Sequence, residues 1–309
     1  MKNINPNLLP DLDVCVLNAL GLFANPKTKL PEINFDAFER PLVVGSGNAA
    51  ATGRIMFADK DAVFADESTY ESRLDAVPSI DGVMLLSASA GKHAPIIAKN
   101  VRSRGLRVVL FTCNPHASDE PDFDEVHVFP SLPEPYTYNT STYMGMILAK
   151  TQENPRRILS HIKRAVNPAL KNSSIDFANF NAFFILVPEE FDLIRPMLNT
   201  KFVELFARRV ARDIFTWEQA KHATRVVEAD AELFISFGKQ NEWGKYRLHI
   251  PLPKKADYAT MMAVGYYVIG KIQAQKLPWF KESIQRYCDN PPTISGKKKT
   301  KYPVIVKYG

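Results

Sequence analysis

The 309-residue chain has only three cysteines, and what it lacks excludes several classes of protein. Cys15, Cys113 and Cys288 are far apart and form no CxxC pair, which argues against a zinc ribbon and a disulfide framework. No apolar run approaches the ~18 residues that a membrane helix needs. The polar start MKNINPNLLPDLD does not resemble a signal peptide. We therefore expect a cytoplasmic protein with no membrane contact and no metal.

Positive charge is concentrated at one end of the chain. The net charge is +6, and much of the excess comes from Lys297, Lys298, Lys299 and Lys301. Such a cluster is more often a solvated tail than a nucleic-acid site, so we do not expect a nucleic-acid partner. The composition, 46% hydrophobic and 23% charged, is that of a globular enzyme.

The first half of the chain alternates strand and helix patterns. Short, continuously apolar segments predict strands at 41–47, 62–66, 82–87, 106–112 and 125–129, with helices at 48–60, 69–77, 93–105 and 140–153. Strands of this kind are typical of a parallel sheet covered on both faces. The pattern predicts a doubly wound α/β sheet, in which ligands bind beyond the carboxyl ends of the strands.

The second half has fewer strand signals. Strands are predicted at 182–188, 232–238 and 246–253, and helices at 189–198, 199–213, 215–229 and 257–275, with a break at Pro196. This half reads as a shorter copy of the first. We divide the chain into an N-terminal helical segment (1–39), a first domain (40–154), a second, shorter domain (155–290) and a basic C-terminal tail (291–309).

Two hydroxyl-rich segments follow predicted strands. If a helix opens at residues 89–92, its amide groups, with Ser87, Ser89 and Lys92, form an anion site. The alternative is that Ser89 simply caps the helix. A second cluster, Thr140-Ser141-Thr142, opens the helix after the last strand of the same half. Two such helix starts at one sheet edge favour a phosphate site.

A glycine turn offers a different interpretation. Gly45-Ser46-Gly47-Asn48-Ala49-Ala50 fits the GxGxxA dinucleotide fingerprint, and Asp66 ends the next strand about twenty residues later. Any strand-to-helix turn that packs tightly also favours small residues. A nicotinamide-dependent oxidoreductase therefore stays open as one alternative.

In their order, these motifs resemble the sugar isomerase (SIS) domain family in its tandem form. The segments "GSGNAA", "SASAGK" and "NTST" are similar to the family's phosphate loops, and "KFVE" (201–204) and "EQAKH" (218–222) to its catalytic segments. The likeness is to the isomerase domain of glucosamine-6-phosphate synthase and to bifunctional phosphoglucose/phosphomannose isomerases, over residues 40–288. It implies two three-layer αβα subdomains. The family usually has Gly where Ala90 stands and Thr where Lys92 stands.

The resemblance implies a set of site residues. Glu204 would be the base that moves a proton between two sugar carbons, and His222 the group that opens the sugar ring; Lys201 and Glu218 would be their neighbours, and Lys281 a lysine near the closing loop. The phosphosugar-binding residues would be Gly47, Asn48, Ser87, Ser89, Lys92, Ser141 and Thr142, together with Lys201 and Glu218.

In the family the histidine commonly reaches the neighbouring subunit's site, so a homodimer is expected. Without the resemblance, Glu204 would pair with Arg208, and His222 with Glu218, on solvated helix faces.

The leading hypothesis is a phosphosugar aldose–ketose isomerase that works through an enediol on a hexose 6-phosphate or amino-hexose phosphate, without cofactor. A deglycase or deaminase of amino-sugar phosphates uses the same enolisation. A non-catalytic SIS protein that binds a phosphosugar is the alternative from another class.

Overall fold

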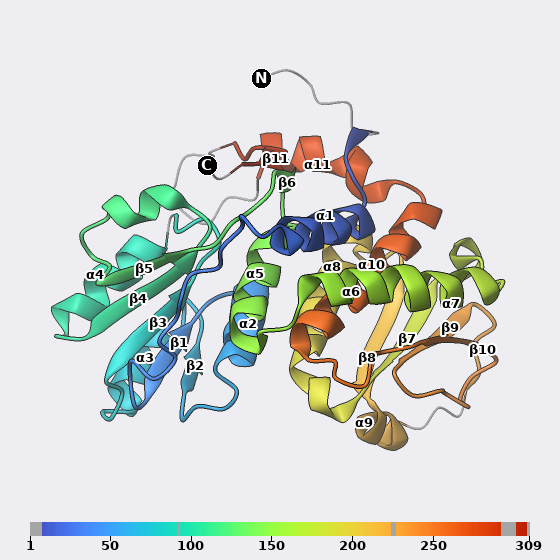
Figure 1. Cartoon of the computed structure of the whole chain (residues 1–309), viewed down its shortest axis with the longest axis horizontal. Coiled ribbons are helices and arrows are strands. Elements are labelled where there is room, and N and C mark those ends of the chain that lie inside the picture. The colour runs from blue at the N-terminus through green and yellow to red at the C-terminus, as the bar shows by residue number, and fades with distance from the viewer. Residues whose placement is uncertain (1–7, 92, 224–226, 292–300, 308–309) are drawn as a thin grey trace.

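Two parallel β-sheets lie on either side of a central layer of helices (Figure 1). The computed structural model describes residues 8–91, 93–223, 227–291 and 301–307. Within these residues, no helix has the length and apolar character that crossing a bilayer requires. The predicted fold class, α/β with two parallel sheets flanked by helices, is confirmed.

The first sheet has the order β2-β1-β3-β4-β5, and all its neighbours are parallel. Its strands are β1 (Pro41–Val44), β2 (Val63–Ala65), β3 (Gly82–Leu86), β4 (Arg107–Thr112) and β5 (Glu125–Val128). The helices are α2 (Asn48–Met56), α3 (Tyr70–Ala76), α4 (Ala94–Ser103) and α5 (Thr140–Thr151), with a 3-10 turn at Pro115–Asp119. The five strands predicted for this half are all present.

Each strand of this sheet sends alternate side chains into two different cores. Met84 and Leu86 of β3 belong to the large core that contains α2 and α5, whereas Val83 and Leu85 pack with α3 and α4. Successive side chains of a strand point to opposite faces, so a fully apolar strand is buried on both. The sheet therefore has helices on both faces.

The second sheet has the order β10-β9-β7-β8 and is also parallel. Its strands are β7 (Ala182–Val187), β8 (Ala211–Thr216), β9 (Glu232–Phe237) and β10 (Tyr246–Ile250). If β7, β8, β9 and β10 are numbered 1 to 4, their order across the sheet is 2-1-3-4, which is the order of the first sheet without its fifth strand.

Three predictions for this half were wrong. Residues 211–216 form β8 and not a helix; this strand buries only Ile214 and Thr216, so it lacks the continuous apolar run of its neighbours. Pro196 lies in the first turn of α8 (Arg195–Phe206), where its missing N–H costs nothing, and does not break the helix. The helix predicted at 215–229 is the short α9 (Trp217–His222), which Thr216 starts with a capping box.

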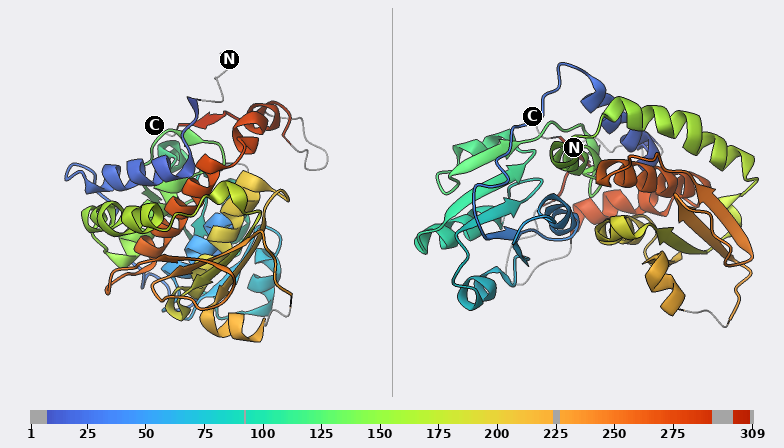
Figure 2. Two further views of the ribbon diagram at one scale, coloured as in Figure 1. Left: turned by 90° about the vertical axis from the view of Figure 1, so that its right-hand side faces the viewer. Right: turned by 60° about the horizontal axis from the view of Figure 1, so that its bottom comes forward.

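The central layer joins segments that are far apart in the sequence (Figure 2). Helix α1 (Leu12–Ala24) lies along α10 (Tyr258–Gln275), and the amide of Leu12 donates to Oε1 of Gln273 at 2.9 Å. A Cβ atom on Gly270 would lie 2.0 Å from the backbone nitrogen of Asp13, so only glycine allows this approach. The buried side chains of α1, α2, α5, α8 and α10 form one continuous core between the two sheets.

The remaining elements connect these layers. Helix α6 (Pro155–His161) continues through a π-helical segment (Ile162–Val166) into α7 (Asn167–Asn172), and 3-10 turns occur at Phe177–Asn179 and Glu189–Ile194. Helix α11 (Trp279–Asp289) follows α10.

Part of the expected C-terminal tail folds back onto the first half. Strand β11 (Ile305–Val306) pairs antiparallel with β6 (Glu134–Pro135), and the ring of Tyr302 stacks on that of Tyr136 at 4.8 Å. Lys297, Lys298 and Lys299 lie outside the described residues. The proposed domain boundaries stay a prediction.

Candidate active site

A buried lysine and a partly buried glutamate of α8 lie where the two halves meet. The Lys201 side chain is 0% exposed, and its Nζ donates to Oε2 of Glu204 at 2.7 Å and to the carbonyl oxygens of Thr137 and Tyr138 at 2.8 Å each. An ammonium group has three N–H donors, and all three are used here. Lys201 therefore fixes Glu204 against the segment that leads into α5.

That segment has a strained backbone. Thr137 has φ +80° and Asn139 has φ +46°, and neither is glycine. A positive φ is uncommon for a β-branched residue, and local strain of this kind gathers at functional sites. The carbonyl of Thr137 is one of the two that bind Lys201. The strained conformation and the Lys201–Glu204 pair are thus parts of one arrangement.

Glu204 has the features of a general base. Its side chain keeps 21% of its surface exposed. Burial raises its pKa above the usual value of 4.5, while the charge of Lys201 and its hydrogen bond oppose that rise. Among the described residues, Oε1 has no hydrogen-bond partner. The alternative pair with Arg208 is not the one observed, because α8 ends at Phe206 and Glu204 binds Lys201.

A buried carboxylate occupies the N-terminus of α5. Glu134 is 4% exposed, and its two oxygens accept the amide hydrogens of Thr140 at 2.5 Å and Ser141 at 2.9 Å. Burial raises its pKa, and these hydrogen bonds and Lys201 oppose the rise. The expectation of a phosphate at this helix start therefore needs correction, because the protein's own carboxylate fills the position that an anion would take.

The hydroxyls of this helix start belong to the framework. Ser141 and Thr142 are 1% and 2% exposed. Ser141 Oγ accepts the amide of Leu132 at 3.0 Å. The Thr142 side chain bonds the thiol of Cys113, whose Sγ also donates to the carbonyl of Ala88 at 3.0 Å. Thr142 is thereby linked to the loop after β3.

Two loops meet at the topological switch point of the first sheet. In the order 2-1-3-4-5, ligands bind beyond the carboxyl ends of the first and third strands. There β1 leads into Gly45–Asn48, and β3 into residues 87–93. Gly47 has φ +56°, and Asn48 is 7% exposed, with no hydrogen-bond partner for its Oδ1 among the residues that the structure describes.

The loop after β3 differs from its prediction. Helix α4 begins at Ala94, so residues 89–92 do not open it, and Ser89 is not its cap. The hydroxyl of Ser89 accepts the amide of Gly91 at 3.3 Å instead. Ser89 is exposed and Ser87 half-buried. Ala90 has φ +49°, a backbone conformation that glycine adopts more readily than alanine. Lys92 lies outside the described residues.

Lys281 lies on α11, a helix that contacts α8. Its Nζ pairs with Oδ1 of Asp11 at 3.0 Å, and the lysine side chain is 16% exposed. The neighbouring Phe280 packs on the ring of Tyr138 at 5.1 Å, next to the carbonyl that binds Lys201. Phe280 thus links α11 to the segment that binds Lys201, whereas the charge of Lys281 is paired with Asp11.

His222 and Glu218 do not meet Glu204 within one chain. They lie on α9, which packs on the outer face of the second sheet, while α8 packs on the inner face. The side chains of His222 and Glu218 are 82% and 61% exposed and are 3.8 Å apart at their nearest polar atoms, as the local-pair alternative expected. Within one chain Glu218 is therefore a neighbour of His222 and not of Glu204, and a meeting of these groups between two subunits stays a prediction.

Asp66, the acidic residue of the dinucleotide interpretation, is engaged within its own turn. Oδ1 of Asp66 accepts from Ser68 N at 2.9 Å, Ser68 Oγ at 2.7 Å and Thr69 Oγ1 at 2.8 Å. These hydrogen bonds lower the pKa of Asp66 to about 2 and close the turn before α3. The sheet order also differs from the 3-2-1-4-5-6 order of dinucleotide-binding domains. Within the described part of the chain, no three His, Cys, Asp or Glu side chains gather as a metal site requires.

Thr137→Gly tests whether the backbone before α5 is strained. Glycine adopts a positive φ freely, whereas other L-residues lose about 1–2 kcal/mol there. Glycine also has more conformational entropy in the unfolded chain, and this lowers the stability gained by the substitution by about 0.5–1 kcal/mol. We expect Thr137→Gly to be up to about 1 kcal/mol more stable than Thr137→Ala in urea unfolding. Thr137→Ala keeps the Cβ atom but removes the buried, unpartnered hydroxyl; equal stability of the two variants would contradict the strain.

Sequence reasoning missed Glu134. It lies in "SLPEPYTYNT", between two prolines, where no periodicity or motif singles it out. Its importance follows from the three-dimensional approach of β6 to the start of α5, which a single sequence does not reveal.

Comparison with known proteins shows the fold. No family model matches the chain, and no curated protein matches it. Among solved structures, glucosamine-6-phosphate deaminase from Thermotoga maritima aligns with TM-score 0.62 at 15% identity, over 85% of this chain and 92% of that one. The C-terminal domain of glucosamine-fructose-6-phosphate aminotransferase from Francisella tularensis has TM-score 0.59 at 11% identity, with coverage of 85% and 92%. Tagatose-6-phosphate ketose/aldose isomerase from Escherichia coli has TM-score 0.56 at 12% identity, with coverage of 87% and 90%.

Proposed function

We propose that this protein is a phosphosugar aldose–ketose isomerase of the tandem SIS type, acting on a hexose 6-phosphate or amino-hexose phosphate. The observation that carries the proposal is the Glu204 carboxylate, which Lys201 holds at the carboxyl edge of the first sheet, next to the start of α5. The three similar proteins described above are enzymes named for phosphorylated sugars, which supports the same substrate class.

In the proposed reaction Glu204 takes the C2 proton of the open-chain aldose. The C1 carbonyl oxygen takes up a proton from water and becomes a hydroxyl, which gives the cis-enediol. Glu204 then returns its proton to C1 while the O2 hydroxyl gives its proton to water, which yields the ketose with no net gain or loss of protons. A carboxylate whose pKa is raised by burial is a stronger base than a solvated one, which favours this step.

The phosphate is assigned to the loops at the switch point of the first sheet. Gly47 and Asn48 follow β1, and Ser87 and Ser89 follow β3. Lys92, which comes soon after them in the sequence, would add a positive charge. Ser141 and Thr142 would act from beneath, by holding Glu134 and Cys113. The unpartnered Oδ1 of Asn48 offers an acceptor to a sugar hydroxyl.

Ring opening requires a group that one chain does not bring to Glu204. We propose a homodimer in which His222, with Glu218, comes from the neighbouring copy, where its exposure leaves it free to reach the second site. Lys281 would act near the closing segment after α10, once released from Asp11.

The proposal is tested by incubating the protein in D₂O with fructose 6-phosphate, glucose 6-phosphate, mannose 6-phosphate or glucosamine 6-phosphate. Proton NMR should show interconversion of one pair, with deuterium entering at the carbon that exchanges its proton. Release of ammonia from glucosamine 6-phosphate would indicate the deaminase variant of the same enolisation. If no sugar exchanges its C–H proton, the isomerase proposal fails.

A non-catalytic phosphosugar-binding protein is the second candidate. The occupation of the α5 N-terminus by Glu134 and the distance of α9 from Glu204 in one chain favour it. Such a protein would be stabilised against heat by a hexose 6-phosphate without any exchange in the D₂O experiment.

A further inference from the structure

The outer face of the second sheet has an unusual crossover. Parallel strands are normally joined by a connection of a dozen or more residues, usually a helix. Strands β9 and β10 are parallel but are joined by residues 238–245 alone, and this segment contains no helix. The connection lies flat on the sheet: a Cβ atom on Gly244 would lie 2.2 Å from the ring of Phe234. Two adjoining cavities, of about 380 and 330 Å³, remain in this region.

The smaller cavity lies at the switch point of the second sheet. Its lining comes from residues that directly follow three of the strands: Glu189 after β7, Trp217 and Lys221 on α9 after β8, and Lys239, Gln240, Glu242 and Trp243 after β9. In the order β10-β9-β7-β8, the point between β7 and β9 corresponds to the ligand-binding crevice of the first sheet. The position is therefore one at which α/β sheets bind small molecules.

The lining combines flat aromatic surface with mixed polar groups. The rings of Trp217 and Trp243 are 5.6 Å apart at 49°, and Nζ of Lys239 lies 5.2 Å from the Trp217 ring centre. Within the described residues, the side chains of Lys239, Gln240 and Glu242 have no hydrogen bond or ion pair. They offer an ammonium donor, an amide and a carboxylate acceptor.

The charges of the lining cancel. Glu189 and Glu242 balance Lys221 and Lys239, and Lys221 is already paired with Glu218 at 2.6 Å. A phosphate would gain little from such a surface. A neutral polyhydroxylated ring suits it better, because its C–H face packs on an indole while its hydroxyls both donate and accept.

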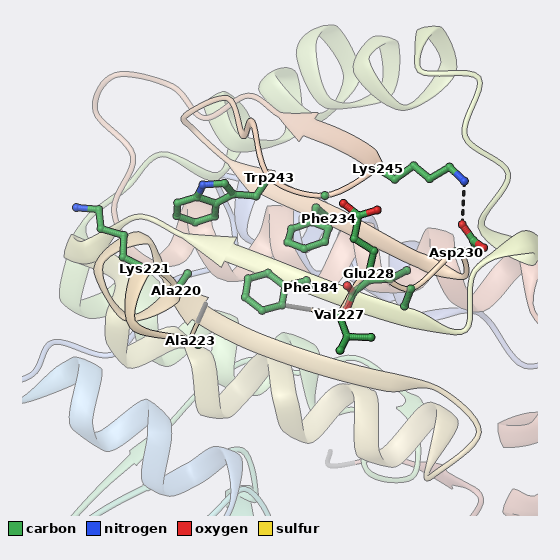
Figure 3. A pocket seen from close by; sticks show the side chains of 13 residues that line it. Phe184, Ala220, Lys221, Ala223, Val227, Glu228, Asp230, Phe234, Trp243 and Lys245 are labelled. Atoms are coloured by element: carbon green, nitrogen blue, oxygen red, sulfur yellow. Dashed lines mark hydrogen bonds and ion pairs between the residues drawn. The ribbon is translucent and has the colours of Figure 1, made fainter. Parts of the chain in front are cut away.

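The larger cavity adds an extension with an apolar floor, which charged residues such as Glu228 and the Asp230–Lys245 pair also line (Figure 3). Phe184 and Phe234 form its floor, and Trp243 and Lys221 lie at the end that it shares with the smaller cavity. Ala220 and Val227 add to the apolar lining. An apolar substituent on a ring bound at Trp243 would enter this space.

We infer that this is a second ligand site, for a neutral sugar with an apolar aglycone, separate from the phosphosugar site. Helix α8, which carries Glu204, lies on the opposite face of the same sheet. The inference does not depend on isomerase activity, because the ligand is uncharged and no residue of the Lys201–Glu204 pair contacts it.

The test is calorimetric titration of the full chain with glucose, phenyl β-glucoside, glucose 6-phosphate and AMP. Phenyl β-glucoside should bind at least tenfold more tightly than glucose. Trp243→Ala should weaken phenyl glucoside at least tenfold, while Glu204→Gln leaves it unchanged. Trp279→Phe, which removes the one tryptophan remote from the cavity, is the matched control.

Three results would overturn the inference: no saturable binding of phenyl glucoside, equal binding by Trp243→Ala when its unfolding curve matches the wild type, or a preference for AMP. The proposed isomerase activity is tested separately, by D₂O exchange of hexose 6-phosphates. The neutral-sugar site and the isomerase proposal can therefore fail independently of each other.

Discussion

We expect Glu204→Gln to lower kcat for the proposed hexose 6-phosphate isomerisation by about 10²–10⁴, the usual contribution of a general base. Glutamine has the same shape, and its amide oxygen still accepts from Lys201, so the fold and the binding of phosphosugar are retained. What is lost is the negative oxygen that takes the proton. Deuterium exchange from D₂O, measured together with phosphosugar affinity, separates the two effects.

Glu190→Gln is the matched control, because it makes the same chemical change on an exposed side chain just before α8. Its activity should equal that of the wild type. Full activity of Glu204→Gln would remove the assignment of the base, and loss of phosphosugar binding would show that Glu204 has a structural function only.

The same assignment fixes the acid side of the pH profile. Glu204 must be ionised to accept a proton, and burial has moved its pKa upward from 4.5. We therefore expect the proposed activity to fall as the pH drops through this raised pKa, at a higher pH than for a solvated glutamate. Because the charge of Lys201 lowers the pKa of Glu204, its removal moves the fall to still higher pH.

Lys201→Met is expected to have the largest effect on stability. It leaves the Glu204 carboxylate and the carbonyl oxygens of Thr137 and Tyr138 without their shared donor. Breaking one side of a buried ion pair costs about 3–5 kcal/mol. Urea unfolding at pH 7 should show a loss of this size.

The loss should depend on pH with a definite sign. A carboxyl whose pKa is higher in the folded chain than in the unfolded chain binds more protons when folded, so its ionisation reduces stability as the pH rises through that interval. Without Lys201, the pKa of Glu204 in the folded chain rises further above its pKa in the unfolded chain. The variant should therefore recover part of its stability as the pH falls toward 4.5, where Glu204 is protonated.

Lys221→Met is the control for this prediction. Lys221 also pairs with a glutamate three residues away on a helix, but both side chains are more than half exposed, at 58% and 61%. Exposed pairs contribute about 0–1 kcal/mol. If Lys201→Met and Lys221→Met lose equal stability, then Lys201 does not hold the site together.

The sequence predicted the elements that burial alone determines. The central strands of the first sheet contain continuous apolar runs such as "GVMLL", a pattern typical of a strand that is covered on both faces. Strand β8 was missed because its charged residues Arg212 and Asp213 interrupt the apolar pattern. Helix α4 was predicted at 93–105 and begins at Ala94, but Ser89 does not cap it, because small and polar residues like those of the loop before α4 also occur without starting a helix.

The site was predictable only where a local motif exists. The pair Lys201 and Glu204 is three residues apart on one helix, so sequence spacing contains the contact. Glu134 meets Thr140 and Ser141 through an irregular turn with two positive φ values, and no sequence pattern encodes that turn. Helix α9 lies far from Glu204 because α8 and α9 pack on opposite faces of the second sheet. This arrangement can be predicted only if β8, the strand between the two helices, is recognised.

The packing of α1 against α10 has a consequence for biosynthesis. These helices are separated by more than two hundred residues, yet Gln273 holds the first turn of α1, and Lys271 pairs with Asp13 at 2.7 Å. During translation α1 is made more than two hundred residues before α10. Helices α5 and α6, which also pack on α1, can cover part of its apolar surface earlier, but the side that packs on α10 stays uncovered until nearly the whole chain has left the ribosome. Nascent chains stopped before residue 258 should therefore bind holdase chaperones through this helix and be released once α10 is made.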